Sequence, residues 1–260
     1  MIKMNAVVLA GGKMAQDDPL YPQGREGSRS LIDLSGRPMV QWVIDAFDES
    51  DAVSELYVMG MQPESGLHAA KPTHFLPDQG SMFANIRSGV LQAAKDHPGS
   101  TKVLIASGDI PAIRPHMVDW LANQVSADPE QMLYYNVITQ AVMEARFPNA
   151  KRSYVRFKDV AVCGGDLNAI DSRLFTTERP IWEQLTSARK QPLKQAAMIG
   201  FDTLLLVALR LVTLERAVKK VCKRLAIQGK ALRCPHAEMG MDADKPHQLE
   251  ILRRDLENRL

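Results

Sequence analysis

The strongest constraint on the fold is an alternation of short apolar runs with segments of helical spacing. Three runs have the character of fully buried strands: residues 6–10, 56–60 and 102–106. Three segments place apolar side chains three and four positions apart, as helices do: residues 38–47, 82–95 and 115–125. This alternation predicts an α/β fold in which helices pack on a mostly parallel central sheet.

The pattern changes after residue 130. Further strands are expected at residues 132–137, 154–157, 160–170 and 230–234, and two glycines interrupt the third of these. Residues 176–226 have a largely helical pattern, and residues 246–260 predict a terminal helix. Because no internal repeat or low-complexity linker divides the chain, we predict one domain over residues 1–260 with a helical insertion at residues 176–228.

Composition excludes several classes of protein. A formal net charge of +2 lacks the excess of basic residues that is usual in nucleic-acid binders. The three cysteines lie far apart without a C-x-x-C motif, which fits a reducing cytosol better than a disulfide or zinc framework. The most apolar stretch, residues 204–214, is too short to span a bilayer and contains Arg210. We therefore expect a cytoplasmic protein without a secretory signal and without a nucleic-acid or membrane partner.

Polar residues follow two of the predicted strands directly. Gly11 and Gly12 follow the first strand, and Asp109 follows the third. The carboxyl edge of an open α/β sheet is where ligands bind, and glycine amides can cradle phosphates there. Neither the G-x-G-x-x-G nor the P-loop fingerprint is present, so the glycine pair alone does not identify the ligand. Asp109 is a candidate metal ligand, with capping of the following turn as the alternative.

Two segments carry a family resemblance. Residues 9–12 (LAGG) and 29–39 (RSLIDLSGRPM) resemble the opening of the MobA-like nucleotidyltransferases, which share the nucleotide-diphospho-sugar transferase fold. The resemblance implies a three-layer sandwich with a Rossmann-like, nucleotide-binding half at residues 1–130. It assigns residues 131–175 and 229–260 to an acceptor and metal half. Arg29 stands where the family has lysine, and the loop at residues 13–27 is longer than the family's.

The resemblance also implies a set of nucleotide-binding residues. They are Leu9, Ala10, Gly11, Gly12, Lys13, Arg25, Arg29, Gly80, Ser81, Asn85 and Gly108. Asn85 can both donate to and accept from a base edge. Ser81 is equally suited to be the N-cap of the following helix. The loop that carries Arg25 and Arg29 is either part of the site or a solvated surface loop.

Two acidic segments match the family's metal ligands. Residues 107–111 (SGDIP) resemble its G-D-x-P motif, and residues 242–246 (DADKP) resemble its second acidic segment. The resemblance implies that Asp109 and Asp242 bind Mg²⁺. Asp244 is a further candidate ligand, but its place just before Lys245 and Pro246 suits a helix start, so we expect Asp242 to bind the metal and Asp244 to cap the helix.

The implied activity is nucleotidyl transfer. An NMP group would pass from an NTP to a phosphorylated small-molecule acceptor, a sugar- or polyol-phosphate, with release of pyrophosphate. Arg29, Asp109 and Asp242 would be catalytic, and the acceptor would meet Gly165, Asp166 and Asn168. The alternatives are a molybdenum-cofactor guanylyl- or cytidylyltransferase and a non-catalytic nucleotide-binding protein. The helical insertion is a candidate cover for the acceptor or a contact in a homodimer.

Overall fold

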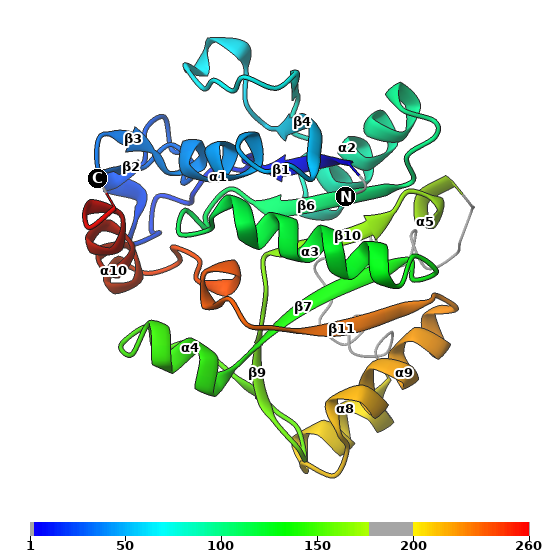
Figure 1. The fold of residues 1–260 in the computed structure, drawn as a ribbon. Helices are drawn as coiled ribbons and strands as arrows, with labels where there is room; N and C mark the ends of the chain where they lie inside the picture. The colour runs from blue at the N-terminus through cyan, green and yellow to red at the C-terminus, as the bar shows by residue number, and fades with distance from the viewer. Residues whose placement is uncertain (1–2, 177–199, 260) are drawn as a thin grey trace.

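A nine-stranded sheet runs through the computed structural model, which describes residues 3–176 and 200–259 (Figure 1). Four parallel strands form its first half: β1 (Met4–Leu9), β4 (Val53–Met59), β5 (Thr73–Leu76) and β6 (Lys102–Ser107). They lie in the order β5-β4-β1-β6. The order places the end of β1, which the glycine pair follows, next to the end of β6, which Asp109 follows.

The second half adds strands of both directions. They are β7 (Leu133–Thr139), β8 (Val155–Arg156), β9 (Ala161–Gly164), β10 (Leu167–Asp171) and β11 (Gly229–Cys234). β10 pairs antiparallel with both β6 and β7, so it joins the two halves, while β11 pairs parallel with β7. β9 and β10 run against the other described strands of this sheet. The prediction of a mostly parallel central sheet is therefore confirmed.

Helices cover both faces of the sheet. α1 (Met39–Asp48), α3 (Pro115–Ala127) and α10 (Pro246–Glu257) pack on one face, and α2 (Met82–Asp96) and α5 (Arg173–Thr176) pack on the other. Side chains of β1 point alternately to the two faces of the sheet. Ala6 and Val8 pack in the core beneath α1, α3 and α10, and Val7 packs in the core beneath α2 and α5. The predicted three-layer α/β sandwich is confirmed.

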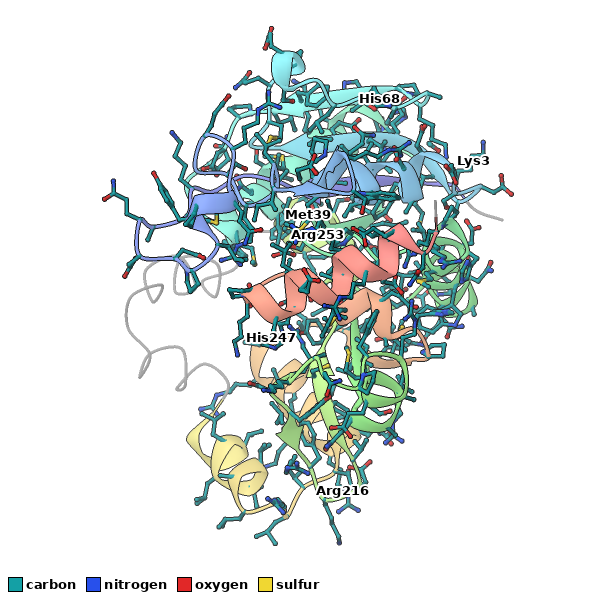
Figure 2. All side chains as sticks on the ribbon, turned by 90° about the vertical axis from the view of Figure 1, so that its left-hand side faces the viewer. Lys3, Met39, His68, Arg216, His247 and Arg253 are labelled. Atoms are coloured by element: carbon teal, nitrogen blue, oxygen red, sulfur yellow. The ribbon has the colours of Figure 1, made fainter. Side chains whose placement is uncertain are left out.

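Two helices of the predicted insertion are described. α8 (Phe201–Ala208) and α9 (Leu214–Leu225) pack against each other, and α9 lies on β11. α9 begins where the Thr213 hydroxyl accepts a hydrogen bond from the Arg216 amide, and it buries Leu214 and Ala217. The remainder of the predicted helical stretch, residues 177–199, lies outside the described residues. Figure 2 shows Arg216 toward the opposite end of the molecule from His68.

Several elements were not predicted. These are α4 (Gln140–Arg146), the hairpin of β2 (Asp33–Leu34) and β3 (Arg37–Pro38), and the 3-10 helices η1 (Tyr21–Gln23), η2 (Pro63–Ser65) and η4 (Ala237–Gly240), together with β5 and α5. Thr139 starts α4 directly at the end of β7, because its hydroxyl accepts a hydrogen bond from the Val142 amide. Within the described helices, none combines the length and the apolar character that a bilayer crossing needs.

Candidate active site

The glycine turn lies where β1, β4 and β6 end side by side. The Ala10 amide donates to Met59 O at 3.0 Å, and the Gly108 amide donates to Leu9 O at 2.8 Å. Gly60, which follows β4, has φ +81°, and a Cβ atom there would lie 2.1 Å from Gly11 Cα. The two backbones can approach this closely only without side chains. Gly12 has φ +99° and open space around it, so its backbone stays accessible to a ligand.

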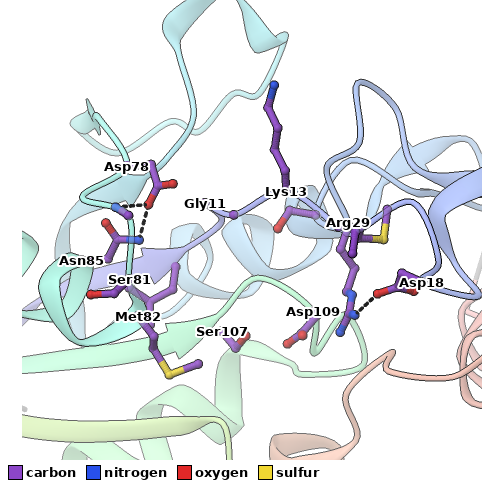
Figure 3. A pocket seen from close by; sticks show the side chains of 16 residues that line it. Gly11, Lys13, Asp18, Arg29, Asp78, Ser81, Met82, Asn85, Ser107 and Asp109 are labelled. Atoms are coloured by element: carbon purple, nitrogen blue, oxygen red, sulfur yellow. Dashed lines mark hydrogen bonds and ion pairs between the residues drawn. The ribbon is translucent and has the colours of Figure 1, made fainter. Parts of the chain in front are cut away.

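A cavity of about 380 Å³ opens beside this turn (Figure 3). Its lining includes eight of the predicted nucleotide-binding residues, namely Leu9, Gly11, Gly12, Lys13, Arg29, Gly80, Ser81 and Asn85, together with Asp109. Ala10 and Arg25 instead line a neighbouring cavity of about 440 Å³, which shares Gly12, Lys13 and Asp78 with the first. Gly108 is buried against β1, where a Cβ atom would lie 3.0 Å from Leu9 O.

The loop before α2 forms one wall of the cavity. Asn85 Nδ2 donates to Asp78 Oδ1 at 2.8 Å, and Asn85 Oδ1 accepts from the Gln79 amide at 2.7 Å. The Asn85 amide is thus engaged in holding the loop. Ser81 Oγ accepts from the Ala84 amide at 3.2 Å, which confirms its role as the N-cap of α2. Asp78 lines both cavities but was not among the predicted site residues. Its position just after β5, at the carboxyl edge of the parallel strands, is the signal that could have identified it.

Asp109 presents an unused carboxylate oxygen. Its Oδ1 atom is buried and has no hydrogen-bond partner among the described residues. Burial raises the pKa of Asp109; Ser107 and Arg29 oppose this rise, and the negative charge of Asp244 adds to it. A buried oxygen without a partner is costly, so its retention at the edge of a cavity suits a cationic ligand.

Asp166 lies beside Asp109 because its backbone ties two elements together. Its amide donates to Met239 O at 2.7 Å, and its carbonyl accepts from the Ser107 amide at 2.9 Å. Its Oδ2 atom is buried and has no partner among the described residues. Burial, helped by the charge of Asp109, raises the pKa of Asp166 to about 7. Two carboxyl groups, one after β6 and one between β9 and β10, therefore lie close enough to act on each other electrostatically.

The other two predicted acceptor residues brace the break between β9 and β10. At Gly165 a Cβ atom would lie 2.9 Å from Asn136 Cβ, so glycine permits close packing on β7. Asn168 Oδ1 accepts from the Asn136 amide at 2.7 Å, and Asn168 Nδ2 donates to Gly165 O at 2.8 Å. Of the three predicted acceptor residues, Asp166 therefore has a buried side-chain oxygen without a partner among the described residues, whereas the side-chain amide of Asn168 is used within the chain.

The two acids before α10 have different partners. Asp242 forms an ion pair with Arg152, and both side chains are largely buried. Asp244 forms an ion pair with Arg29, and its charge raises the pKa of both Asp109 and Asp166. The Ala243 amide donates to Asp109 O at 3.0 Å, which ties this segment to the end of β6.

The prediction that Asp244 caps α10 is wrong. The N-cap is Lys245, without a side-chain capping bond. The Asp244 carboxylate is engaged by the guanidinium of Arg29, a charged partner that offers a stronger hydrogen bond than a backbone amide.

The carboxylates fit a hard divalent cation that also has phosphate ligands. Within the described part of the chain, no group of three or more His, Cys, Asp or Glu side chains is arranged to hold a metal ion. Mg²⁺ does not need such a cage, because it is usually bound by one or two carboxylates together with water and substrate phosphates. The unpartnered Asp109 oxygen and the half-exposed carboxylate of Asp244, which Arg29 contacts through Oδ1, are compatible with that requirement.

Solved structures share this fold. A hypothetical transferase from Thermus thermophilus is 32% identical, with a TM-score of 0.80 over 95% of this chain and 100% of its own. A CMP:2-keto-3-deoxy-manno-octonic acid synthetase complexed with CTP is 16% identical, with a TM-score of 0.57 over 99% and 100%. A 2-C-methyl-D-erythritol 4-phosphate cytidylyltransferase, also from Thermus thermophilus, is 13% identical, with a TM-score of 0.55 over the full length of both chains.

A comparison with curated proteins finds no match. A comparison with protein families does find one. The MobA-like NTP transferase domain family matches residues 6–225, a range that includes the glycine turn, Arg29 and Asp109 but ends before Asp242 and Asp244. The predicted family and the predicted class of enzyme, a nucleotidyltransferase, are thereby confirmed. The chain belongs to the MobA-like NTP transferase domain family.

Proposed function

We propose that this protein transfers an NMP group from an NTP to a phosphorylated small-molecule acceptor, a sugar- or polyol-phosphate, and releases pyrophosphate. The observation that carries the proposal is the buried, unpartnered oxygen of Asp109 at one side of a cavity that also contains the glycine turn. The names of two structural neighbours, a CMP-sugar-acid synthetase and a cytidylyltransferase, support the same reaction type.

The reaction needs no protein nucleophile. An oxygen of the acceptor phosphate attacks the α-phosphorus of the NTP, a new P–O bond forms, and the bond to the bridging oxygen breaks. Pyrophosphate leaves with the electron pair of that bond. The attacking phosphate is already anionic, so the protein contributes position and neutralisation of charge.

The residues divide this work between them. The open backbone at Gly12 and the guanidinium of Arg29 lie along one cavity, where they can contact the triphosphate. Arg29 offsets the charge that develops on the leaving pyrophosphate. Mg²⁺, when bound, would neutralise phosphate charge and align the two reacting groups.

We propose Asp109 and Asp244 as the carboxylates that hold Mg²⁺, in place of Asp109 and Asp242. Each acid pairs with an arginine, but Asp244 acts electrostatically on Asp109 and its side chain is 50% exposed, whereas Asp242 is only 14% exposed against Arg152. Asp242 would then orient Arg152, a buried guanidinium whose Nε atom has no partner among the described residues. Arg152 and Asp166 act on each other electrostatically, and we place the acceptor beside them.

The test is pyrophosphate release from each of the four NTPs with a panel of phosphorylated acceptors. Release that requires Mg²⁺ and one acceptor class supports the proposal. A panel that includes molybdopterin separates the sugar- or polyol-phosphate acceptors from the pterin of a molybdenum-cofactor enzyme. NTP binding without release under any acceptor would instead identify a non-catalytic nucleotide-binding protein.

Asp109→Asn tests the site directly. Removing this charge should lower turnover by at least about 100-fold. The melting temperature should not fall, because burial of the Asp109 charge is unfavourable. Asp33→Asn is the matched control, since Asp33 is an exposed carboxylate on the β2–β3 hairpin. Undiminished Mg²⁺-dependent turnover in Asp109→Asn would rule out the assigned centre.

A further inference from the structure

Arg29 is held from two sides. Its Nη2 atom donates to Asp18 Oδ2 at 2.7 Å, and its Nη1 atom donates to Asp244. Burial alone would lower the pKa of Arg29, but the hydrogen bond to Asp18 and the charges of Asp244 and Asp109 raise it. Figure 3 shows the guanidinium directed toward Asp18 and Asp109, while the side chain of Lys13 extends away from them. The cation nearest the Asp109 end of this cavity is therefore Arg29.

Asp18 is itself held in place by the long loop that follows the glycine turn. Its Oδ1 atom accepts from the Leu20 amide at 2.8 Å, which leaves Oδ2 for Arg29. Leu20 is fully buried in the main core, so the residue two positions beyond Asp18 anchors the loop. The base of the loop closes as a hairpin, where the Met14 amide donates to Gly27 O at 2.8 Å. The loop thus delivers one carboxylate oxygen to Arg29.

We propose that Asp18 is a positioning residue that orients the Arg29 guanidinium toward the phosphates of the nucleotide. The proposal rests on the function proposed above. A guanidinium presents several N–H groups in a rigid fork, so Nη2 can remain bonded to Asp18 while an N–H that neither Asp18 nor Asp244 uses contacts a phosphate oxygen. The ammonium group of a lysine at this position would be a single point charge, without separate nitrogens for Asp18 and for a phosphate. The longer loop and the arginine at position 29 are then parts of one arrangement.

Holding Arg29 in advance has a physical benefit. A free arginine side chain loses considerable rotamer freedom when it binds a ligand. Asp18 removes much of that freedom before the nucleotide arrives, and its charge-assisted bond is partly shielded, since the Asp18 and Arg29 side chains are 16% and 27% exposed. Asp18 also lines the cavity, but its side-chain hydrogen bonds in the described residues are to the Leu20 amide and Arg29, so we expect its effect to pass through Arg29.

Asp18→Asn isolates this contact. Asparagine keeps an Oδ1 atom to accept from the Leu20 amide, but it replaces the carboxylate oxygen that faces Arg29 with an NH₂ group. The matched control is Asp17→Asn, because Asp17 is exposed, carries the same charge and makes no side-chain hydrogen bond or ion pair in the described structure. We expect Asp18→Asn to lower kcat/KM for the NTP about tenfold without changing KM for the acceptor. Asp17→Asn should match the wild type, and both variants should still unfold in one cooperative transition.

The second arm uses Arg29→Lys as a background. If Asp18 acts through the fork of Arg29, Asp18→Asn should change kcat/KM for the NTP less than about twofold once lysine stands at position 29. An equal, additive loss in both backgrounds would overturn the proposal. Equal kinetics for Asp18→Asn and Asp17→Asn in the wild-type background would overturn it as well.

Equilibrium binding of the same NTP to each protein separates this proposal from the proposed function. If the wild type binds the NTP but releases no pyrophosphate, the proposed function fails, and the Kd values of the variants still test Asp18. A weaker Kd for Asp18→Asn alone then supports the positioning role, and unchanged values refute it. Absence of NTP binding by the wild type would overturn both proposals.

Discussion

Replacing Asp166 with asparagine should stabilise the protein, and the gain should grow with pH. Asp166 carries a buried, unpartnered oxygen, and its pKa is raised from 3.8 to about 7 by burial and by the charge of Asp109. Between these values the folded chain holds a proton that the unfolded chain has lost. Stability conferred by that proton is therefore lost as pH rises toward 7. This cost is the expected signature of a residue kept for its function.

The magnitude follows from the two pKa values. From pH 5 to pH 8, the ionisation of Asp166 should lower the free energy of unfolding of the wild type by about 2–3 kcal/mol. Asp166→Asn has no such group, so the difference in stability between the two proteins should widen by that amount. The measurement is denaturant unfolding of both proteins at pH 5 and pH 8 in the presence of a metal chelator.

Asp17→Asn again provides the control, because it removes an exposed carboxylate. Its difference from the wild type should stay the same at both pH values to within about 0.5 kcal/mol. If Asp166→Asn behaves like this control, or becomes less stable than the wild type at pH 8, burial does not control the ionisation of Asp166 and the reasoning is refuted.

Two further predictions concern stability and the turn. Asp171 is fully buried beside Lys102; burial would raise its pKa, but hydrogen bonds from Arg173 and Lys102 lower it to about 2. Asp171→Asn should cost about 3 kcal/mol in denaturant unfolding at pH 7, with a smaller loss near pH 2, where about half of the wild-type carboxyl groups are protonated in the folded chain. Gly60→Ala should destabilise the chain by about 2 kcal/mol or more and weaken NTP binding, because Cβ would meet Gly11 Cα at 2.1 Å. Gly36→Ala, also at φ +81° but in open space, should bind NTP normally and melt closer to the wild type.

Most of the fold was predictable because its signals are local. Buried runs and helical spacing identified β1, β4 and β6 and the helices α1, α2 and α3 within a few residues of their bounds. Several short elements escaped this reasoning: β2 and β3 have two residues each, and α4 begins immediately after β7 without an intervening turn. In such segments hydrogen bonds to distant strands or to a cap decide the structure, and periodicity carries little information.

The candidate site was predictable where a residue's role follows from its place on a strand. Gly11, Gly12 and Asp109 follow β1 and β6, and the structure brings all three to one cavity. Asn85 and Asn168 have side chains suited to ligand recognition, yet their amides are used within the chain to hold the loop at residues 77–80 and the break between β9 and β10. The type of side chain alone does not reveal such internal partners.

The sequence by itself determined the layered α/β architecture, the glycine turn and the acid at the end of β6, because each depends on neighbours in the chain. Only the tertiary structure revealed that Asp242 and Asp244, which differ by two positions, have different partners, Arg152 and Arg29. It also joined Arg29 to Asp18 and, across 215 residues, to Asp244. Electrostatic energy depends on distance in space and on burial, and the order of residues along the chain specifies neither directly.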